Sequence, residues 1–366
     1  RTGGVVTQTG VLTADSANLT GSGASYTLNS SNSIGTLTAN TGTLSITNNR
    51  STSVLGAVTV TNNTTLSTTG SISQSGALTT TGLALNGTGG SYSLTNAGNN
   101  FASLTGSTGS VMVSDSTAVS VGPITTTGGL SVTSAGSLSV DGAVLVGGGT
   151  TSLLRATAGD VTVNATVRKS AGATSSIQFN ASNRVSVNAA VSSLGGAFNT
   201  EVVAGAGGIG LNASINTSGG TLTLNTTGTS TQTTAFTTGT LTLNGTGGMH
   251  VLASNANNFA TLTGNTGSMT LVNSAATTSF GATTTTGNLQ YNGAGNLSLA
   301  GTVTVGGSLI LTTPGSVTQT AAFSAGALDL NGGGTSYVLN DAANVFGSLT
   351  GTTGSISLTN NSATST

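Results

Sequence analysis

The residue types that the chain lacks exclude several kinds of structure. Its 366 residues include no cysteine and no tryptophan, only two prolines, and 4% charged residues. Without cysteine, the chain forms neither a disulfide bond nor a thiolate metal site. Six Lys and Arg against seven Asp and Glu leave a net charge of −1, so there is no basic face for nucleic acid or an anionic membrane. No segment approaches 18 consecutive apolar residues, which argues against a transmembrane helix.

Strong helix formers are also scarce. Lys169 and Glu201 are the only lysine and glutamate, while Gly, Ser, Thr and Asn dominate, and these four are poorer in helix interiors. Apolar residues instead alternate with polar ones, as in Leu83-Ala84-Leu85 and Leu222-Thr223-Leu224. This two-residue period is typical of strands, and the Gly- and Asn-rich segments between them are typical of turns. The sequence predicts an all-β protein of short strands.

One signature occurs four times. A glutamine in a short polar segment is followed 18 residues later by a ring-bearing residue, then by Ile or Phe, and then by Leu-Thr-x-x-Thr-Gly. Modules carrying it begin near residues 4, 70, 228 and 315. The glutamines are Gln8, Gln74, Gln232 and Gln319, the ring residues are Tyr26, Tyr92, His250 and Tyr337, and the apolar residues are Ile34, Phe101, Phe259 and Phe346.

The spacing of the signature suggests a coil length. Successive glutamines lie 66, 158 and 87 residues apart, close to 3, 7 and 4 times about 22 residues, which suits one turn of a parallel β-solenoid. We therefore predict a parallel β-solenoid of about 22 residues per coil and about 17 coils. It runs as one continuous solenoid over residues 1–366, with divergent coils at about 156–227 and a short excursion near Arg168–Thr174.

Stacked coils place like residues in columns. Inward Leu, Val and Ile build a narrow core, and Phe101, Phe259 and Phe346 are expected to fill the same corner in their modules. The asparagines that follow Leu-x-Leu strands are expected to form amide ladders; they are Asn86, Asn225, Asn244 and Asn331. No Asp, Glu, Lys or Arg occurs from Val202 to Leu328, which is consistent with stacking because like charges on neighbouring strands repel.

Three segments carry a family resemblance: Gly159–Ala165, Val185–Ser193 and Gly208–Leu224. Their rhythm of short Val, Ile and Leu strands separated by Asn-Ala and Gly-Gly turns resembles the filamentous haemagglutinin-like exoproteins of bacterial two-partner secretion and the related autotransporter passenger domains. The resemblance covers nearly the whole chain as a style of repeat. It implies a right-handed parallel β-helix, export across the outer membrane, and roles in adhesion, biofilm or surface fibres.

The two ends of the chain lie within repeats. Residues Arg1–Asn29 align without a gap with Thr312–Asn340, and Ser355–Thr366 align with Thr43–Val54. Solenoids use capping repeats to protect their end strands, and none is recognisable in the sequence. We expect the chain to be part of a longer repeat protein, or neighbouring copies of the chain to cover its ends.

Candidate reactive residues are few. His250 is the only histidine and stands where three copies have tyrosine, which favours a structural substitution. We predict no catalytic, cofactor-binding or metal-binding residue. Two weaker hypotheses concern charged residues: Asp141 and Asp160 could approach each other on adjacent coils as a polysaccharide-cleaving pair, and Arg168-Lys169 could contact an anionic glycan, although a solvated loop is the simpler interpretation.

These observations predict a non-catalytic structural or adhesive segment of a secreted or surface-displayed bacterial fibre, located outside the cell. Its expected partners are further coils, head-to-tail copies of itself, and a glycan or cell surface, but not nucleic acid. The alternatives are a polysaccharide-binding or polysaccharide-cleaving β-helix, and an ice-binding solenoid that uses strands such as Thr221-Leu222-Thr223.

Overall fold

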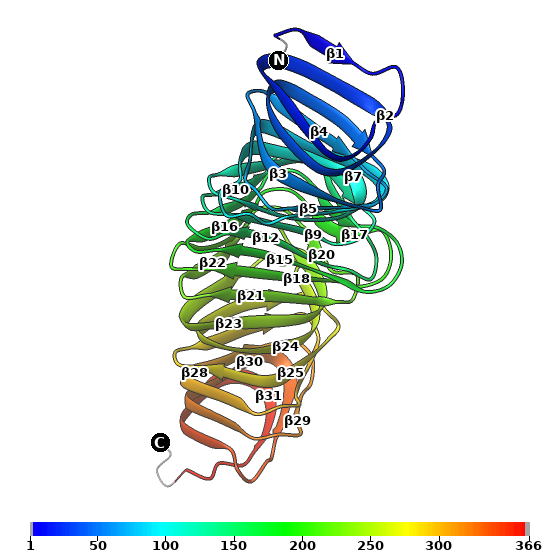
Figure 1. Ribbon diagram of the computed structural model, residues 1–366. Coiled ribbons are helices and arrows are strands. Elements are labelled where there is room, and N and C mark those ends of the chain that lie inside the picture. Colours follow the sequence, from blue (N-terminus) through cyan, green and yellow to red (C-terminus); the bar gives the residue numbers. More distant parts are fainter. Residues whose placement is uncertain (1–2, 363–366) are drawn as a thin grey trace. The chain divides into compact units, whose positions relative to one another are not determined.

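The computed structural model describes residues 3–362, and every regular element within them is a β-strand. The chain divides into two compact units, Arg1–Ser182 (unit 1) and Asn183–Thr366 (unit 2). Each unit is a parallel β-solenoid (Figure 1), and the two together contain about 18 turns. Residues 1–2 and 363–366 of the predicted solenoid lie outside the described residues. Within residues 3–362 there is no helix that could span a membrane.

Over residues 3–182, unit 1 contains fifteen strands. They are β1 (Val5–Thr7), β2 (Thr13–Asn48), β3 (Thr52–Val60), β4 (Asn63–Ser67), β5 (Ser71–Gln74), β6 (Leu78–Leu94), β7 (Asn100–Asp115), β8 (Val119–Thr126), β9 (Leu130–Ser134), β10 (Leu138–Val140), β11 (Val144–Val146), β12 (Thr151–Ala156), β13 (Val161–Val163), β14 (Val167–Lys169) and β15 (Ser175–Ala181).

The described part of unit 2, residues 183–362, contains sixteen strands. They are β16 (Arg184–Val187), β17 (Val191–Ser193), β18 (Phe198–Ala204), β19 (Gly208–Leu211), β20 (Ile215–Asn216), β21 (Thr221–Thr226), β22 (Thr229–Gln232), β23 (Phe236–Leu252), β24 (Asn258–Asn273), β25 (Thr277–Thr285), β26 (Leu289–Gly293), β27 (Asn296–Leu299), β28 (Val303–Thr312), β29 (Val317–Gln319), β30 (Phe323–Leu339) and β31 (Val345–Leu358).

In the interior of each unit, a strand pairs in parallel with the strands one turn before and one turn after it. Leu138 in β10, for example, lies between Val119 in β8 and Val161 in β13. The longest turns hold the predicted excursion: Ser152 pairs with Ile177, 25 residues later. The parallel β-solenoid predicted from the sequence is therefore confirmed, whereas its right-handed sense stays a prediction.

The predicted coil length needs a correction. Most turns advance the chain by about 20 residues, as between Val5 and Ser25 or between Leu289 and Leu309, so the coils are shorter and slightly more numerous than predicted. The error arose because the signature does not recur after a whole number of turns. The ladder traced back from Gln319 passes through Leu299, Phe280, Leu262 and Leu241, and it misses Gln232.

The core is a thin apolar column that follows from strand alternation. In β21, Leu222 and Leu224 are fully buried while the threonines beside them are partly exposed. In unit 2, aromatic rings on successive turns pack within this core: Phe236 stacks on Phe259 at 6.2 Å and Phe323 stacks on Phe346 at 6.1 Å, and the two pairs lie on different register columns. Burial of each such side chain contributes about 1.5–3 kcal/mol, so stability accumulates turn by turn.

Candidate functional site

The signature glutamine closes a buried amide pair. In the second copy, Gln74 Nε2 donates to Asn99 Oδ1, and Asn99 Nδ2 donates back to Gln74 Oε1 at 3.1 Å. The same two side chains accept the backbone N–H groups of Asn96 and Leu78 at 3.1 and 2.8 Å. Asn99 also donates to the carbonyl oxygen of Leu94 at 3.0 Å. The pair thus satisfies backbone groups at a bend where strand pairing is interrupted.

All four copies contain this pair. Each asparagine is at most 1% exposed, follows its glutamine by 24 or 25 residues, and precedes the signature Ile or Phe by two. The other three pairs are Gln8–Asn32, Gln232–Asn257 and Gln319–Asn344. The spacing of the repeated signature pointed to the glutamines but not to the asparagines. Their constant distance from Ile34, Phe101, Phe259 and Phe346 was the signal that could have found them.

The ring-bearing residue joins two turns. Tyr92 is buried, and its hydroxyl donates to the carbonyl oxygens of Leu66 and Asn86 at 2.8 and 2.6 Å. Tyr337 makes the equivalent bonds to Leu311 and Asn331 at 3.0 and 2.9 Å. Burial raises the pKa of the Tyr337 phenol to about 12. These tyrosines act as neutral structural donors.

The first and third copies depart from this arrangement. Tyr26 donates to the carbonyl oxygen of Thr20 at 2.9 Å. His250 is fully buried, and its Nε2 lies 3.2 Å from the carbonyl oxygen of Asn244. The histidine therefore occupies the tyrosine position as a structural substitution, but it reaches fewer backbone groups.

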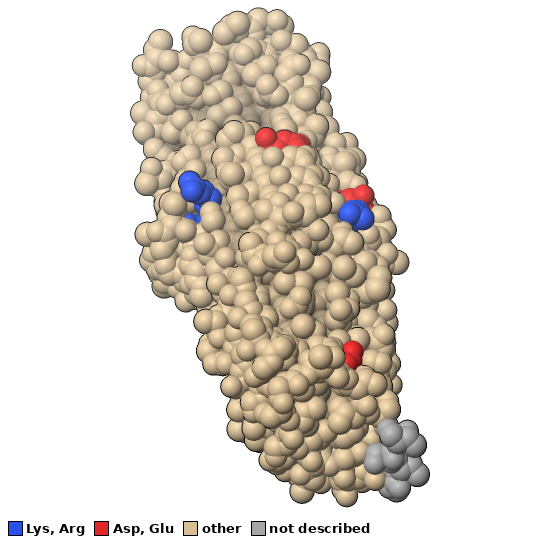
Figure 2. Space-filling view, turned by 180° about the vertical axis from the view of Figure 1, so that it is seen from behind, with Lys and Arg blue, Asp and Glu red and all other residues tan. Residues whose placement is uncertain are grey.

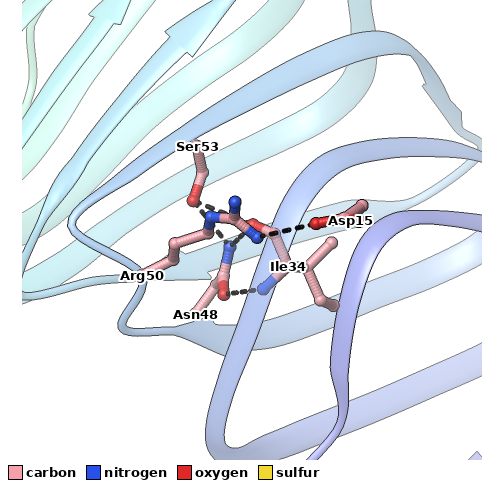
Figure 3. Close-up of polar contacts among 5 residues, drawn as sticks. All are labelled: Asp15, Ile34, Asn48, Arg50 and Ser53. Carbon is pink, nitrogen blue, oxygen red and sulfur yellow. Dashed lines mark hydrogen bonds and ion pairs between the residues drawn. The ribbon is translucent and has the colours of Figure 1, made fainter.

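A second amide clamps the signature Ile or Phe. In the first copy, Asn48 Oδ1 accepts the Ile34 N–H at 2.8 Å, and Asn48 Nδ2 donates to the Ile34 carbonyl oxygen at 2.8 Å and to Ser53 Oγ at 2.9 Å (Figure 3). Arg50 lies beside this clamp and forms a 3.6 Å ion pair with Asp15. Corresponding side chains bind Phe101, Phe259 and Phe346 in the other copies; they are Asp115, Asn273 and Asn360.

The outer side of unit 2 carries a regular polar array. Three successive turns present Thr-Thr-Asn in register, and Thr242 Oγ lies 3.0 Å from Thr263 Oγ. The three columns are Thr221–Thr240–Thr261, Thr223–Thr242–Thr263 and Asn225–Asn244–Asn265. The predicted asparagine ladder therefore exists here. Elsewhere it was wrong, because Asn86 pairs with Ser67 and Ser107, and Asn331 pairs with Thr312 and Thr352.

The structure does not bring Asp141 and Asp160 together as a pair. Asp141 accepts hydrogen bonds from Ser120 Oγ, Ser139 Oγ and Asn164 Nδ2 at 2.6, 2.5 and 2.9 Å. These bonds, led by that from Ser120, lower the pKa of the Asp141 carboxyl group. Asp160 lies at the opposite end of the short β13 strand from Asn164, roughly 13 Å away along the chain. Glycosidases hold their two carboxyl groups about 5–10 Å apart and facing each other.

The structure also differs from the solvated loop predicted at Arg168 and Lys169. Lys169 is fully buried, and its Nζ donates to the carbonyl oxygens of Ser170 and Gly172 at 3.1 Å each. Since an ammonium group is costly to bury without such partners, Lys169 stabilises the excursion from inside, and only Arg168 of the two is exposed. The solvated-loop interpretation was wrong for Lys169.

Charged groups are sparse on the surface as well. Figure 2 shows a few charged groups on one face, one acidic and one basic group adjoining each other, among a large majority of uncharged residues. Over residues 3–362, no three His, Cys, Asp or Glu residues cluster in a way that could hold a metal ion.

Comparison with known proteins places the repeat in a family. Residues 41–108, 108–177 and 287–353 match the family model described as Repeats of unknown function (DUF5649), and together they span more than half of the chain. The first and third segments end at equivalent residues, Thr108 and Thr353, each just before the glycine of the signature. No curated protein and no solved structure matches the chain.

Proposed function

The chain belongs to the family of repeats of unknown function DUF5649, and from this premise we propose that it is a non-catalytic structural and adhesive segment of a secreted or surface-displayed bacterial fibre. The observation that carries the proposal is the use of the signature: its glutamines with their partner asparagines, and its tyrosines, bond groups at the bends and between the turns of a parallel β-solenoid. Repeats that serve only to extend a solenoid suit a spacer or fibre.

The resemblance to filamentous haemagglutinin-like exoproteins and autotransporter passenger domains supports a location outside the cell. The near-absence of charge supports the fibre form, since columns of uncharged Thr, Ser and Asn let turns stack without repulsion. In this proposal the partners are further coils of the same chain or head-to-tail copies of it, together with a glycan or another cell surface.

Immunogold labelling of intact cells that produce the protein tests the location. Gold particles on unbroken cells, with rods visible in negative stain, are the expected result. Labelling that appears only after the cells are broken open would contradict the proposal.

Ice binding is a second candidate, favoured by one observation. Thr-Leu-Thr repeats once per turn in β21, β23 and β24, in register, so a rigid, uncharged grid of hydroxyl and methyl groups faces outward. Thermal hysteresis of the wild-type chain should then be measurable, and it should be abolished by Thr242→Tyr at the centre of the grid. A wild-type chain without hysteresis would dispose of this candidate.

Polysaccharide cleavage is the least supported alternative, because the carboxyl groups of Asp141 and Asp160 do not flank a common site. We expect no release of reducing ends from neutral or acidic polysaccharides, and the same result for Asp141→Ala as for the wild-type chain.

A further inference from the structure

One pair of residues in unit 2 breaks the pattern of the other copies. Ser230 in β22 pairs in register with His250 in β23. The equivalent pairs in the other copies are apolar-aromatic: Val6–Tyr26, Ile72–Tyr92 and Val317–Tyr337. Both positions of the third copy are thus polar and smaller, although the site is as buried as in the second and fourth copies.

The substitution leaves polar atoms without partners. Ser230 Oγ and His250 Nδ1 are buried and have no hydrogen-bond partner. His250 is 0% exposed, and Met269, its register partner on the other side, is 1% exposed. An unsatisfied buried polar atom costs about 1–3 kcal/mol, so this is a weak point in a solenoid whose other signature groups are bonded.

No charge is present to balance a protonated imidazole. Asp, Glu, Lys and Arg are absent from Val202 to Leu328, a range that includes the strands on either side of His250. The one other titratable side chain between Val202 and Leu328 is Tyr291, whose phenol is bonded to Thr278 and whose pKa is raised by burial. It therefore stays neutral in acid. A cation at His250 would meet Ser230 and Met269 on the neighbouring turns and the carbonyl oxygen of Asn244, but no carboxylate from residues 202–328.

We infer that the Ser230–His250 pair is an acid-sensitive point built into β22 and β23, at which protonation of the buried imidazole opens the adjoining turns of unit 2. Solenoid turns contact only their neighbours, so a local opening need not unfold the remainder. The inference goes beyond the proposed function and does not depend on it.

The direction of the effect follows from linkage. Burial lowers the pKa of His250 from 6.5 to about 4, opposed only by the bond to Asn244. The unfolded chain therefore binds a proton below pH 6.5, while the folded turns bind it only near pH 4. Stability contributed by this site is complete above pH 6.5 and is lost as the pH falls toward 4. The equilibrium constant for closing these turns decreases by up to about tenfold per pH unit in that window.

The test compares the wild-type full chain with His250→Tyr. Hydrogen exchange is measured at pH 7.5, 6 and 4.5 and expressed as protection factors. A protection factor divides the intrinsic exchange rate at each pH by the observed rate, so the effect of pH on exchange itself is removed. Protection in β22 and β23 should fall on the order of a hundredfold in the wild type between pH 7.5 and 4.5, and should change far less in the variant. His250→Gln, which takes no proton in this range, replaces the tyrosine variant if that variant does not fold.

A transplant provides the matched control. Val317→Ser with Tyr337→His places the same pair in the fourth copy, where it should create a second acid-sensitive segment in β29 and β30. Equal loss of protection in the wild type and both His250 variants would overturn the inference. So would a transplanted pair that leaves β29 and β30 insensitive to acid.

Discussion

At the residue scale, fold specificity depends on buried amides. Asn99 accepts hydrogen bonds from Gln74 Nε2 and from the Leu78 N–H, and it donates one to the carbonyl oxygen of Leu94. Because its loss would leave the N–H of Leu78 and the Gln74 side chain unsatisfied in the interior, we expect Asn99→Ala to lower the free energy of unfolding by about 2–4 kcal/mol.

Urea unfolding followed by circular dichroism measures this difference. The neighbouring exposed Asn100 is the matched control, and Asn100→Ala should change the free energy by less than about 0.5 kcal/mol. Equal effects of the two substitutions would mean that the amide pair is not a structural element.

A second residue-scale prediction concerns neutral pH. Restoring the consensus with Ser230→Val and His250→Tyr removes two orphaned polar atoms and lets a hydroxyl reach the carbonyl oxygens of Asn244 and Leu224, as Tyr92 does with Asn86 and Leu66. We expect the double variant to be more stable than the wild type by about 1–3 kcal/mol at pH 7.5.

The two substitutions should also be coupled, since the side chains are register partners in contact. A double-mutant cycle by thermal or urea unfolding measures the coupling. A double variant less stable than the wild type would show that the serine and histidine are better packed than their unsatisfied atoms indicate.

Sequence reasoning recognised Gln74 and Tyr92 as structural residues because they recur at constant spacing. It could not name Asn99 as the partner of Gln74, because a separation of 25 residues becomes a contact only when the register of the turns is known. The polar pair at Ser230 was missed for the same reason: its meaning depends on which residue lies one turn away.

At the element scale, the corners are set by glycines at particular conformations. Gly332 has φ +146°, and a Cβ there would lie 2.0 Å from the carbonyl oxygen of Thr313, whereas a Cβ at the adjacent Gly333 would meet no atom within 4 Å. We expect Gly332→Ala to lower the free energy of unfolding by about 2 kcal/mol or more.

Gly333→Ala is the control and should stay within about 0.5 kcal/mol of the wild type. Urea unfolding of both variants in parallel checks the pair. If Gly332→Ala were as stable as Gly333→Ala, the close approach of successive turns at this corner would be wrong.

The sequence predicted least well the number of residues in a turn and the register of each turn on the next. Alternation identified strands such as Val161–Val163 and Leu222–Leu224 correctly, because strand period is local. The coil length was overestimated since the signature advances by four turns and a further part of a turn between Gln232 and Gln319. The prediction that Asp141 and Asp160 approach each other was also wrong, because residues on adjacent turns can still lie at opposite ends of a strand.

At the scale of the whole molecule, composition predicted an all-β protein, and the spacing of the repeated signature predicted the parallel solenoid. Few charges and frequent Gly, Thr and Asn suit this fold, which buries short apolar strands in small portions. Sequence could not show how the chain divides into two units, because both use the same repeat.

The central claim is that turns of about 20 residues stack in parallel register, and a pair of introduced cysteines tests it most directly. The chain has no native cysteine, and Thr242 and Thr263 are outward register partners, so their Cα atoms lie about 5 Å apart, within disulfide range. Oxidation should link Thr242→Cys with Thr263→Cys inside one chain. It should leave the control pair, Thr242→Cys with Thr261→Cys, unlinked, because two residues out of register the Cα atoms are about 8 Å apart. Preferential linkage of the control pair, or of neither, would contradict the account.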